Sequence, residues 1–449
     1  GSPALYNNTE GSSNAAIGYN ALQYNTTGAS NNAIGWIALN CNTTGSHNTA
    51  IGNNTLRSNT TGSHNTAIGC VALCSSLSGD HNFAAGRCAL YGNWGGCYNT
   101  AIGIDALKCN TTGVCNVAIG PYALRYNTTG CHNNALGYNL MANTTGEFNT
   151  AISDQALNAN TTGDHNTAIG QYAQIGNTTG CYNVSIGRQA LMNSLSGCYN
   201  FAVGNCAMRE SWGGSNNTAI GHRALHCNTT GGQNNALGDQ ALKANTTGNY
   251  NNALGYIALW SNTTGGSNNA IGRDTLYSNT EGCFNTAIGC GALRYNTTAS
   301  YNNAMGHQAL YSNTTGSCNT AIGRNALYTN TEGNWNAAVG TCALYSNTTG
   351  CYNNAIGLHA LKSNTTANNN AAIGYGALEA NTTGTHNYAT GYYALGSNTT
   401  GSNNTALGSY ALKNSLSGDH NFAAGNNALR DNWGGCYNTA MGYKALSNN

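Results

Sequence analysis

Hydrophobic and polar positions repeat along this chain with a period of 17 residues. The unit reads N-[N/T]-A-[I/L]-G-x-x-A-L-x-x-N-T-T-G-x-x, and its motif glycine recurs from Gly18 to Gly137 and from Gly170 to Gly442. No change of composition interrupts the array. Self-similarity at a fixed short period is typical of solenoid architectures. The sequence therefore predicts one continuous repeat domain, residues 1–449, of about 26 coils.

A one-residue deletion separates the two runs of the motif. Leu140 lacks the alanine that normally precedes it, and Ser153 then occupies the glycine site. The 17-residue spacing resumes unchanged downstream. We therefore expect the fold to continue through the deletion.

Each unit is too short for paired helices and too rich in turn residues for one long helix. Solenoids of paired helices need about 33–47 residues per unit, whereas most units here hold an Asn-Thr-Thr-Gly turn and a second glycine. Gly and Asn supply backbone conformations that other residues resist. The pattern therefore predicts an all-β, single-chain β-solenoid (β-roll) whose coils combine short strands with tight turns.

Compensating side-chain sizes at two positions indicate an extended strand. Where the residue before the motif glycine shrinks to alanine, at Ala85, a phenylalanine stands two residues earlier, at Phe83, and later coils repeat the exchange. Residues two apart share a side only in a strand. We interpret that side as the core, which would then hold a ladder of residues such as Ile17 and a second ladder of residues such as Leu22.

Charge is scarce in this protein. Only 6% of residues are charged and the net charge is +1, whereas about 25% is usual in globular proteins. Such a chain has no electrostatic footprint for nucleic acid or an anionic membrane. No stretch approaches the roughly 18 apolar residues that span a bilayer. We expect no nucleic-acid binding and no membrane insertion.

Residues with candidate chemistry are scattered. The 14 carboxylates occupy varied repeat positions, whereas a glycosidase needs two that face each other across a groove. His47, His64, His81 and His165 each stand alone in a coil, where we interpret them as surface turn residues. No zinc-type cysteine spacing is present. We expect no catalytic site, no cofactor and no metal, and therefore no enzyme.

The 18 cysteines point to an oxidising compartment outside the cell. Half of them lie one or two residues after the turn glycine. Two that share one site in adjacent coils would stand at the strand spacing, which lies inside the disulfide window of about 4.4–6.8 Å. Cysteines without such a partner are open to cross-linking between chains. The candidate disulfide pairs are Cys181 with Cys198, Cys88 with Cys97, and Cys342 with Cys351.

The Asn-Thr-Thr sequence at the turn has the form of an N-glycosylation acceptor. Consecutive coils would place their glycans only about 4.8 Å apart. The alternative is a turn whose stacked Asn amides hydrogen-bond along the rod. The candidate acceptors are Asn25, Asn59, Asn127, Asn160, Asn245, Asn313, Asn347 and Asn381.

Three two-coil blocks alter the turn in the same way. Ser-Leu-Ser-Gly replaces Asn-Thr-Thr-Gly in the first coil, and a Trp-Gly-Gly turn follows in the second. One interpretation is a local packing variant. The other is a contact for a glycan or a neighbouring subunit, because tryptophan is enriched at such contacts. The tryptophans concerned are Trp94, Trp212 and Trp433.

The segments Asn319–Leu327 and Asn48–Leu56 carry the sequence N-x-A-I-G-x-x-A-L, with Thr55 replacing the second alanine in the latter. This pattern resembles the head repeats of trimeric autotransporter adhesins and related surface-fibre arrays, over essentially the whole chain. The resemblance implies a left-handed β-roll with a surface role in attachment. The 17-residue unit with its added turn is longer than the usual head repeat, and no stalk heptads or anchor are found. Trimerisation and anchoring are therefore not carried over.

Together these patterns predict an extracellular or cell-surface structural fibre subunit that associates with itself. Assembly would use open solenoid ends, burying Leu5 and Leu446 at the junction, or lateral faces rich in Tyr and Asn. One alternative is a surface adhesin whose Tyr and Trp side chains bind glycans. A second alternative is an ice-binding solenoid that presents the column of Asn-Thr-Thr turns.

Overall fold

The computed structural model describes residues 3–138 and 143–448, and within these ranges the chain forms 26 three-residue strands and no helix. The protein is a parallel β-solenoid with a 17-residue repeat, which confirms the predicted fold class. The predicted left-handedness stays a prediction. Part of the sequence deletion, at Asn139 and Leu140, lies outside the described residues. The pairing of Asn134 with Thr150 on either side of it is nevertheless in register, as expected.

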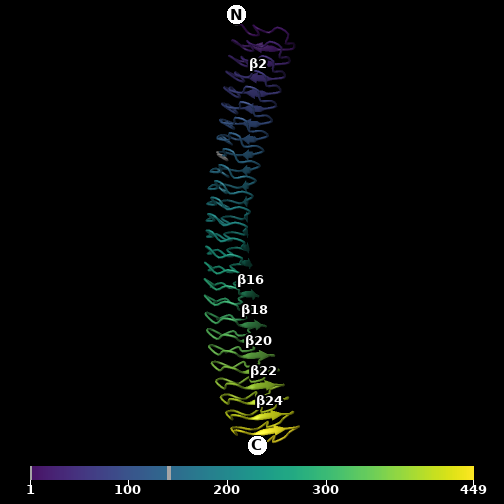
Figure 1. The fold of residues 1–449 in the computed structure, drawn as a ribbon, viewed down its shortest axis with the longest axis vertical. Helices are drawn as coiled ribbons and strands as arrows, with labels where there is room; N and C mark the ends of the chain where they lie inside the picture. Colours follow the sequence, from purple (N-terminus) through teal and green to yellow (C-terminus); the bar gives the residue numbers. More distant parts are fainter. Residues whose placement is uncertain (1–2, 139–142, 449) are drawn as a thin grey trace. The chain divides into compact units, whose positions relative to one another are not determined.

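The chain divides into two compact units, Gly1–Ala219 and Ile220–Asn449, which we describe separately. Figure 1 draws the strands as arrows and colours the chain along its sequence. The single continuous domain expected from the sequence stays a prediction. The strands of the first unit are β1 (Ala15–Ile17), β2 (Asn32–Ile34), β3 (Thr49–Ile51), β4 (Thr66–Ile68), β5 (Phe83–Ala85), β6 (Thr100–Ile102), β7 (Val117–Ile119), β8 (Asn134–Leu136), β9 (Thr150–Ile152), β10 (Thr167–Ile169), β11 (Val184–Ile186) and β12 (Phe201–Val203). Strand β13 (Thr218–Ile220) spans the boundary in sequence. The strands of the second unit are β14 (Asn235–Leu237), β15 (Asn252–Leu254), β16 (Asn269–Ile271), β17 (Thr286–Ile288), β18 (Asn303–Met305), β19 (Thr320–Ile322), β20 (Ala337–Val339), β21 (Asn354–Ile356), β22 (Ala371–Ile373), β23 (Tyr388–Thr390), β24 (Thr405–Leu407), β25 (Phe422–Ala424) and β26 (Thr439–Met441).

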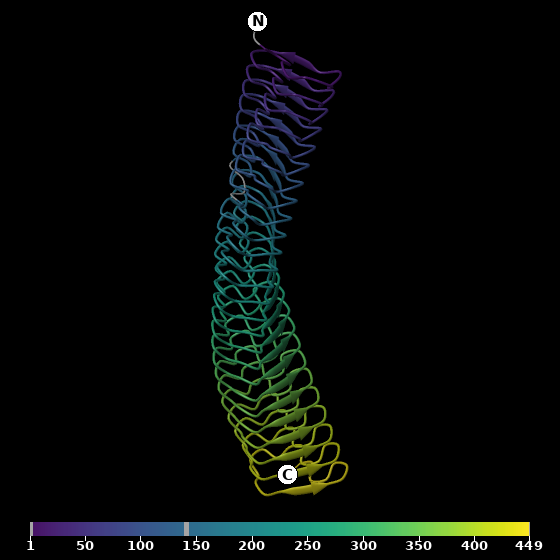
Figure 2. The ribbon, with the colours of Figure 1, turned by 45° about the horizontal axis from the view of Figure 1, so that its top comes forward.

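Consecutive strands within each unit pair in parallel and in exact repeat register. In the first unit Ala16 pairs with Ala33, and in the second Ala253 pairs with Ala270. Each coil contributes one strand to one side, and turns form the other sides (Figure 2). Hydrogen bonds between coils continue outside the strands, because the backbone N–H of Leu22 donates to the carbonyl oxygen of Ala38 at 3.0 Å. Equivalent residues therefore stack as columns, and each column can be considered as one site repeated along the unit.

The core of the coil is built from small residues and one leucine. The middle strand residue, such as Ala33, and the following Ala38 and Leu39 are fully buried. The predicted leucine ladder, which includes Leu22, is confirmed. A strand of three residues closed by tight turns leaves little interior width, so only a small residue fits on the strand side, alanine in nearly every strand and serine at Ser185.

The predicted second core ladder is wrong. The residue before the motif glycine points outward, and Ile17 and Ile34 are 64% and 41% exposed. Phe83 is 37% exposed on the same outer side. The first and third strand residues do share a side, as the Phe83–Ala85 exchange indicated, but that side is the surface. The alternation of a strand does not by itself say which side is buried.

Most of the described coils hold three non-glycine residues in the left-handed backbone region. In one coil these are Asn20, Leu22 and Ser30, with φ of 52°, 53° and 57°. Such values are uncommon for side chains other than Asn and Asp. Burial of Leu22 and the hydrogen bonds between coils impose this conformation on the backbone.

The motif glycine is required by both conformation and space. Gly35 has φ of 139°, and a Cβ added there would collide with the carbonyl oxygen of Gly52 in the next coil. Ser153, which takes this site after the deletion, has a positive φ of 93°. A non-glycine residue is strained in this region of backbone space.

Candidate functional site

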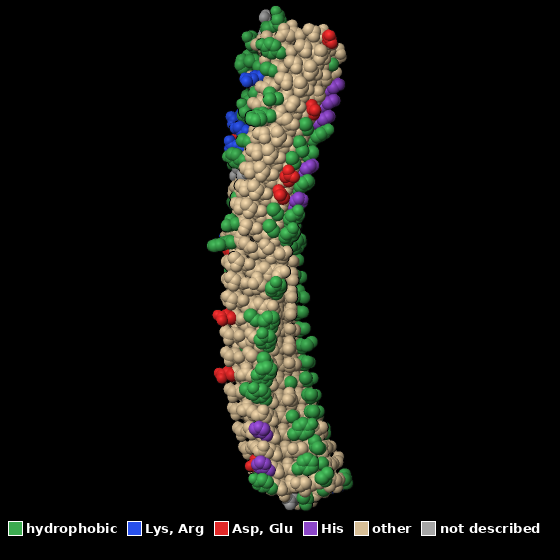
Figure 3. All heavy atoms as spheres, viewed as in Figure 1, with side chains coloured by type: hydrophobic (Ala, Val, Ile, Leu, Met, Phe, Trp, Pro, Cys, Tyr) green, Lys and Arg blue, Asp and Glu red, His purple; other side chains and the backbone are tan. Residues whose placement is uncertain are grey.

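The outer side of the strands forms an uncharged face, which we call the strand face: the first and third residues of every strand. None of the 26 described strands contains Lys, Arg, Asp or Glu. The third residue is an exposed Ile or Leu in most coils, with exposed fractions of 42% at Ile271 and 47% at Ile356. In the part of Figure 3 that shows the second unit, a row of hydrophobic side chains follows the edge where Figure 1 draws the strands. Sequence analysis missed this face because it assigned these residues to the core.

A shallow groove of about 230 Å³ lies on the strand face of β14–β16. Its lining residues are Asn235, Leu237, Asn252, Ala253, Leu254 and Ile271. The exposed asparagines beside it bond to one another, since Nδ2 of Asn235 donates to Oδ1 of Asn252, and Nδ2 of Asn252 donates to Oδ1 of Asn269, both at 2.8 Å. These amides have already used much of their hydrogen-bonding capacity, so the face is an apolar surface with a short spatial period.

Positive charge is concentrated at a different corner of the coil. Nine of the 15 Lys and Arg residues directly follow the buried Leu or Met of their coil. In the second unit the same column also holds aromatic rings, and Nζ of Lys243 lies 5.2 Å from the ring centroid of Trp260. The nine residues are Arg57, Lys108, Arg125, Arg209, Lys243, Arg294, Lys362, Lys413 and Arg430.

The three tryptophans of the variant blocks are exposed on turns. Trp94, Trp212 and Trp433 are 58%, 56% and 61% exposed. One coil earlier, the same column holds an exposed leucine in each block, such as Leu77. The glycine after Trp94 leaves open space, because a Cβ at Gly95 would meet only Oγ of Ser78 within 4 Å, at 3.8 Å. Each block therefore presents an exposed tryptophan that is followed by a glycine with open space around it, and a serine hydroxyl lies close by.

The turn asparagines form a buried ladder along each unit, which confirms the stacked-amide alternative. Nδ2 of Asn313 donates to Oδ1 of Asn296 in the preceding coil at 2.9 Å and to the carbonyl oxygen of Gly316 at 2.8 Å. Both hydrogen-bond positions of this side-chain nitrogen are occupied within the fold, and glycosylation of these residues stays a prediction. All eight candidate acceptors are fully buried: Asn25, Asn59, Asn127, Asn160, Asn245, Asn313, Asn347 and Asn381.

A second buried asparagine ladder precedes the strands. The backbone N–H of Asn48 donates to Oδ1 of Asn31 at 2.9 Å, while Nδ2 of Asn48 donates to the carbonyl oxygen of Gly62 at 2.8 Å. Buried backbone groups at the turns thereby find partners that the short strands do not supply. The invariant Asn of the repeat is thus a structural residue.

The cysteines after the turn glycine occupy a column that accepts hydrogen bonds. The backbone N–H of Ser46 donates to Oγ of Ser63 at 3.1 Å, and that of Ser63 donates to an Asp80 oxygen at 2.6 Å. In the next coil the backbone N–H of Asp80 donates to Sγ of Cys97 at 3.3 Å. Ser, Asp and Cys are interchangeable in this column because each brings an acceptor to the same place. Seven cysteines accept in this way: Cys97, Cys131, Cys181, Cys198, Cys283, Cys351 and Cys436.

The predicted disulfide partners differ in how the fold places them. Cys181 and Cys198 share the acceptor column, where the backbone N–H of Cys181 donates to Sγ of Cys198 at 3.2 Å. Burial is the main cause that raises the pKa of the Cys181 thiol. Cys88 lies in the turn that follows a strand and Cys97 in the turn that precedes the next one, and Cys342 and Cys351 repeat that placement. All six are free thiols in this structure, and their pairing stays a prediction.

The histidines before the strands are exposed turn residues, as expected, but they do not act singly. His47, His64 and His81 stack on one another with ring centroids 4.8 and 4.7 Å apart, and Tyr98 continues the stack. Among the described residues no group of three His, Cys, Asp or Glu side chains is placed to hold a metal ion. Sequence analysis considered each coil alone and so did not foresee the stacking.

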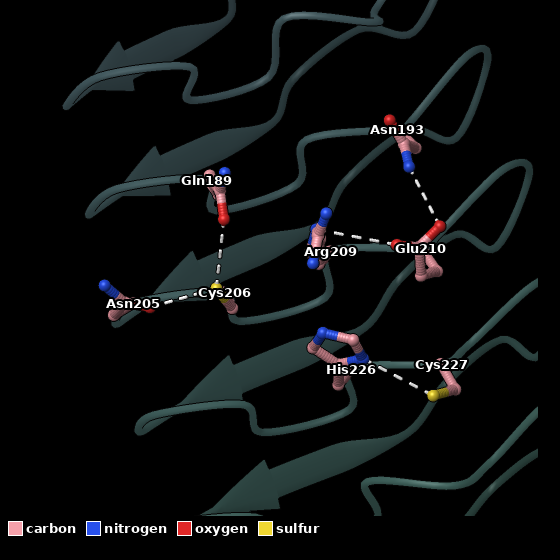
Figure 4. A network of polar contacts seen from close by, with 8 residues as sticks. All are labelled: Gln189, Asn193, Asn205, Cys206, Arg209, Glu210, His226 and Cys227. Atoms are coloured by element: carbon pink, nitrogen blue, oxygen red, sulfur yellow. Dashed lines mark hydrogen bonds and ion pairs between the residues drawn. The ribbon is translucent and has the colours of Figure 1, made fainter.

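Other polar side chains also bond along columns (Figure 4). In the first unit Nδ2 of Asn193 donates to a Glu210 oxygen one coil on at 2.8 Å, and Arg209 Nε lies 3.5 Å from the other oxygen. The thiol of Cys206 lies 2.9 Å from Oδ1 of Asn205 and 3.4 Å from Oε1 of Gln189. The contacts of Asn193 with Glu210 and of Cys206 with Gln189 join neighbouring coils, and the carboxylate of Glu210 is engaged with structural partners.

The described residues hold no apolar helix of membrane-spanning length. Neither a protein-family model nor a curated protein sequence matches the chain. The resemblance to autotransporter head repeats stays a prediction. What distinguishes this molecule are two surface features, the strand face and the three tryptophan turns.

Proposed function

We propose that this protein is an extracellular structural subunit that builds fibres by packing its strand face against the strand face of further copies. The observation that carries the proposal is the combination of regularly exposed Ile and Leu side chains with the absence of any charged residue from the described strands. Soluble monomers rarely expose a long contiguous apolar surface. The end-to-end stacking expected from the sequence stays a prediction.

A second copy of the chain is the partner that matches this face best. Apolar side chains stand on it once per coil, at the parallel-strand spacing of about 4.8 Å. Only a surface with the same period brings every Ile or Leu of one face against one of the other. Sheets packed face to face in this way lie about 10 Å apart, and the side chains between them interdigitate. The absence of charge removes the repulsion and desolvation that would oppose such a contact.

The remaining features support an extracellular and non-enzymatic role. The cysteine content is high for a reducing compartment. Carboxylates such as Glu210 are engaged with neighbouring side chains along the columns. The proposal therefore assigns the protein no catalytic residue, no cofactor and no metal.

The test is to place charge on the groove of the second unit. The double variant Leu254→Lys, Ile271→Lys leaves the buried alanines and leucines of the core unchanged and should abolish lateral assembly in sedimentation and electron microscopy. Thr264→Lys, on an exposed turn, is the matched control and should assemble as the wild type does. Circular dichroism melts should be similar for all three proteins. A wild-type protein that stays monomeric at high concentration, or a double variant that still assembles, would overturn the proposal.

Glycan binding at the tryptophan turns is the second candidate function. It is favoured by the exposed rings of Trp94, Trp212 and Trp433. Each ring is followed by a glycine with open space around it, and a serine hydroxyl lies nearby. A sugar ring offers C–H groups to the aromatic face and hydroxyls to the serine. Calorimetry or array binding with oligosaccharides should lose signal in the triple alanine variant. Trp335→Ala, at a tryptophan that is 56% exposed outside the blocks, is the control that should retain binding.

No described feature favours the ice-binding alternative. The first threonine of the turn is held by the backbone, since Oγ1 of Thr43 donates to the carbonyl oxygen of Thr60 at 3.0 Å. A single column of exposed second threonines at a turn is narrower than a flat binding face.

A further inference from the structure

The buried ladder of turn asparagines is interrupted at the three variant blocks. In the first unit the ladder runs through Asn25, Asn42 and Asn59, each bonded to the one before it. The next position is Ser76, whose hydroxyl does not reach its neighbours. The ladder resumes beyond it, because Nδ2 of Asn110 donates to Oδ1 of Asn93 at 2.8 Å.

The asparagine before each interruption and the interrupting serine itself hold unsatisfied polar atoms. Oδ1 of Asn59 and Oγ of Ser76 are buried and have no hydrogen-bond partner. The same pair of atoms is unpartnered at Asn177 and Ser194 and again at Asn398 and Ser415. A buried polar group without a hydrogen bond is unfavourable, and native structures rarely contain one without a reason.

These interruptions concentrate a large share of the unpartnered atoms in the protein. Within the described residues, 14 buried side-chain oxygen and nitrogen atoms lack a partner, and seven of them belong to the three ladder breaks. The seventh comes from Ser211, which places a second serine in the ladder directly after Ser194. A random distribution of imperfect contacts would not gather them in one column.

We propose that each ladder break is a built site for ordered water, which takes the place of the missing carboxamide. Serine is shorter than asparagine, and the room it releases is on the scale of a single water molecule, about 30 Å³ in the liquid. The atoms that face this room are neutral: a carbonyl-type oxygen from Asn59, a hydroxyl from Ser76 and an amide donor from Asn93. A water molecule donates to the first and exchanges a hydrogen bond with the second.

The neutral lining also excludes other small occupants. A metal ion or ammonium would enter a buried site with no carboxylate beside it, and burying an unpaired charge is strongly unfavourable. An apolar molecule would leave Asn59 and Ser76 unsatisfied. One water is expected at the break of Ser76, one at that of Ser415, and two where Ser194 and Ser211 follow each other, or about four in all.

The experiment counts long-lived buried waters by oxygen-17 relaxation dispersion and locates them by high-resolution crystallography. Ser76→Asn rebuilds the ladder with the residue that other coils use at this position, so the variant should fold. It should lose one long-lived water and one density peak beside Asn59, and its melting temperature should rise. Replacing all four serines should remove about four such waters.

Ser78→Asn is the matched control, because it makes the same chemical change two residues away on the exposed side of the turn. It should leave the water count and the melting temperature unchanged. A wild-type crystal structure with no density beside Asn59 and Ser76 would overturn the proposal. An equal number of long-lived waters in wild type and Ser76→Asn would do the same.

Discussion

The side-chain amide of Asn42 donates to Oδ1 of Asn25 at 2.7 Å, so one carboxamide joins two neighbouring coils. The same nitrogen donates to the carbonyl oxygen of Gly45 at 2.8 Å and closes its own turn. Because Asn59 in turn donates to Oδ1 of Asn42, each residue of the ladder holds three segments of backbone in place. Loss of one member therefore affects three coils.

Asn42→Ala should destabilise the protein strongly. It leaves Oδ1 of Asn25 without this donor, and a buried group left unpaired costs about 1–3 kcal/mol. It also removes one hydrogen bond from the Gly45 carbonyl oxygen, which keeps Nδ2 of Asn31, and one from the Asn59 amide, which keeps Gly62. We expect a loss of at least about 2 kcal/mol in the free energy of unfolding, measured by urea denaturation. Thr44→Ala, on the exposed side of the same turn, should change it by less than about 0.5 kcal/mol. Equal losses in the two variants would contradict the structural role of the ladder.

Phe83→Ala should be mild, whereas Leu90→Ala should be severe. Phe83 lies on the strand face with 37% of its surface exposed, while Leu90 is fully buried. Truncating a buried leucine typically costs about 2–5 kcal/mol, and we expect less than about 1 kcal/mol at Phe83 because much of the ring is already solvated. Thermal melts of the two variants provide the comparison. A larger loss at Phe83 would restore the core assignment that the sequence suggested.

Cys181→Ser should be tolerated and Cys181→Val should not. Serine places an acceptor where Sγ accepts the backbone N–H of Asp164 at 3.3 Å, as Ser63 does for Ser46. Valine leaves that N–H without this acceptor, which costs about 1 kcal/mol or more. Hydrogen exchange of the Asp164 amide should quicken in the valine variant and stay slow in the serine variant. A valine variant that is as stable as wild type, and whose Asp164 amide exchanges as slowly, would contradict this prediction.

Ser153→Gly should stabilise the first unit. Ser153 stands at the motif-glycine site with φ of 93°, a value that strains a residue with a Cβ. Relief of this strain is worth about 1–3 kcal/mol, partly offset by the greater freedom of glycine in the unfolded chain. Calorimetry should show a higher melting temperature for the variant. Ser12→Gly, at an exposed turn site, serves as the control for the entropic effect alone.

The ion pair of Asp431 with Arg430 predicts a specific pH dependence. Arg430 Nη2 lies 2.6 Å from an Asp431 oxygen, and this hydrogen bond is the main cause that lowers the pKa of the Asp431 carboxyl. A lowered pKa in the folded state contributes stability that is present above the unfolded value, near 3.9, and is lost as pH falls through the folded value. Asp431→Asn should therefore melt earlier than wild type at pH 7.

The difference in melting temperature between Asp431→Asn and wild type should shrink as the pH falls below about 4 and vanish at lower pH. Glu281→Gln, on an exposed turn, supplies the control for a change of net charge. A difference between Asp431→Asn and wild type that stays constant from pH 7 to strongly acidic pH would show that the ion pair does not contribute in this way.

Several features of the fold follow directly from local sequence. The 17-residue period identifies the coil, and the turn residues in each unit exclude long helices. The leucine that recurs in most coils lies in the core, as its repetition suggested, and Leu22 is an example. The asparagine column at Asn25 was recognised as a hydrogen-bonded ladder or a glycan acceptor, and stacking at the coil spacing already favoured the ladder.

The sequence by itself determined the repeat, the strand and the residues that share a side of it, because these depend on spacing along one chain. Only the tertiary structure decided that Ala33 points inward and Ile34 outward. A strand of alternating side chains has two equivalent sides, and the choice between them depends on the width of the closed coil. That width is set by residues far apart in the unit, such as Leu39 opposite the strand and the paired asparagines at the turns. An interior this narrow admits alanine on the strand side and leaves the larger isoleucine on the surface.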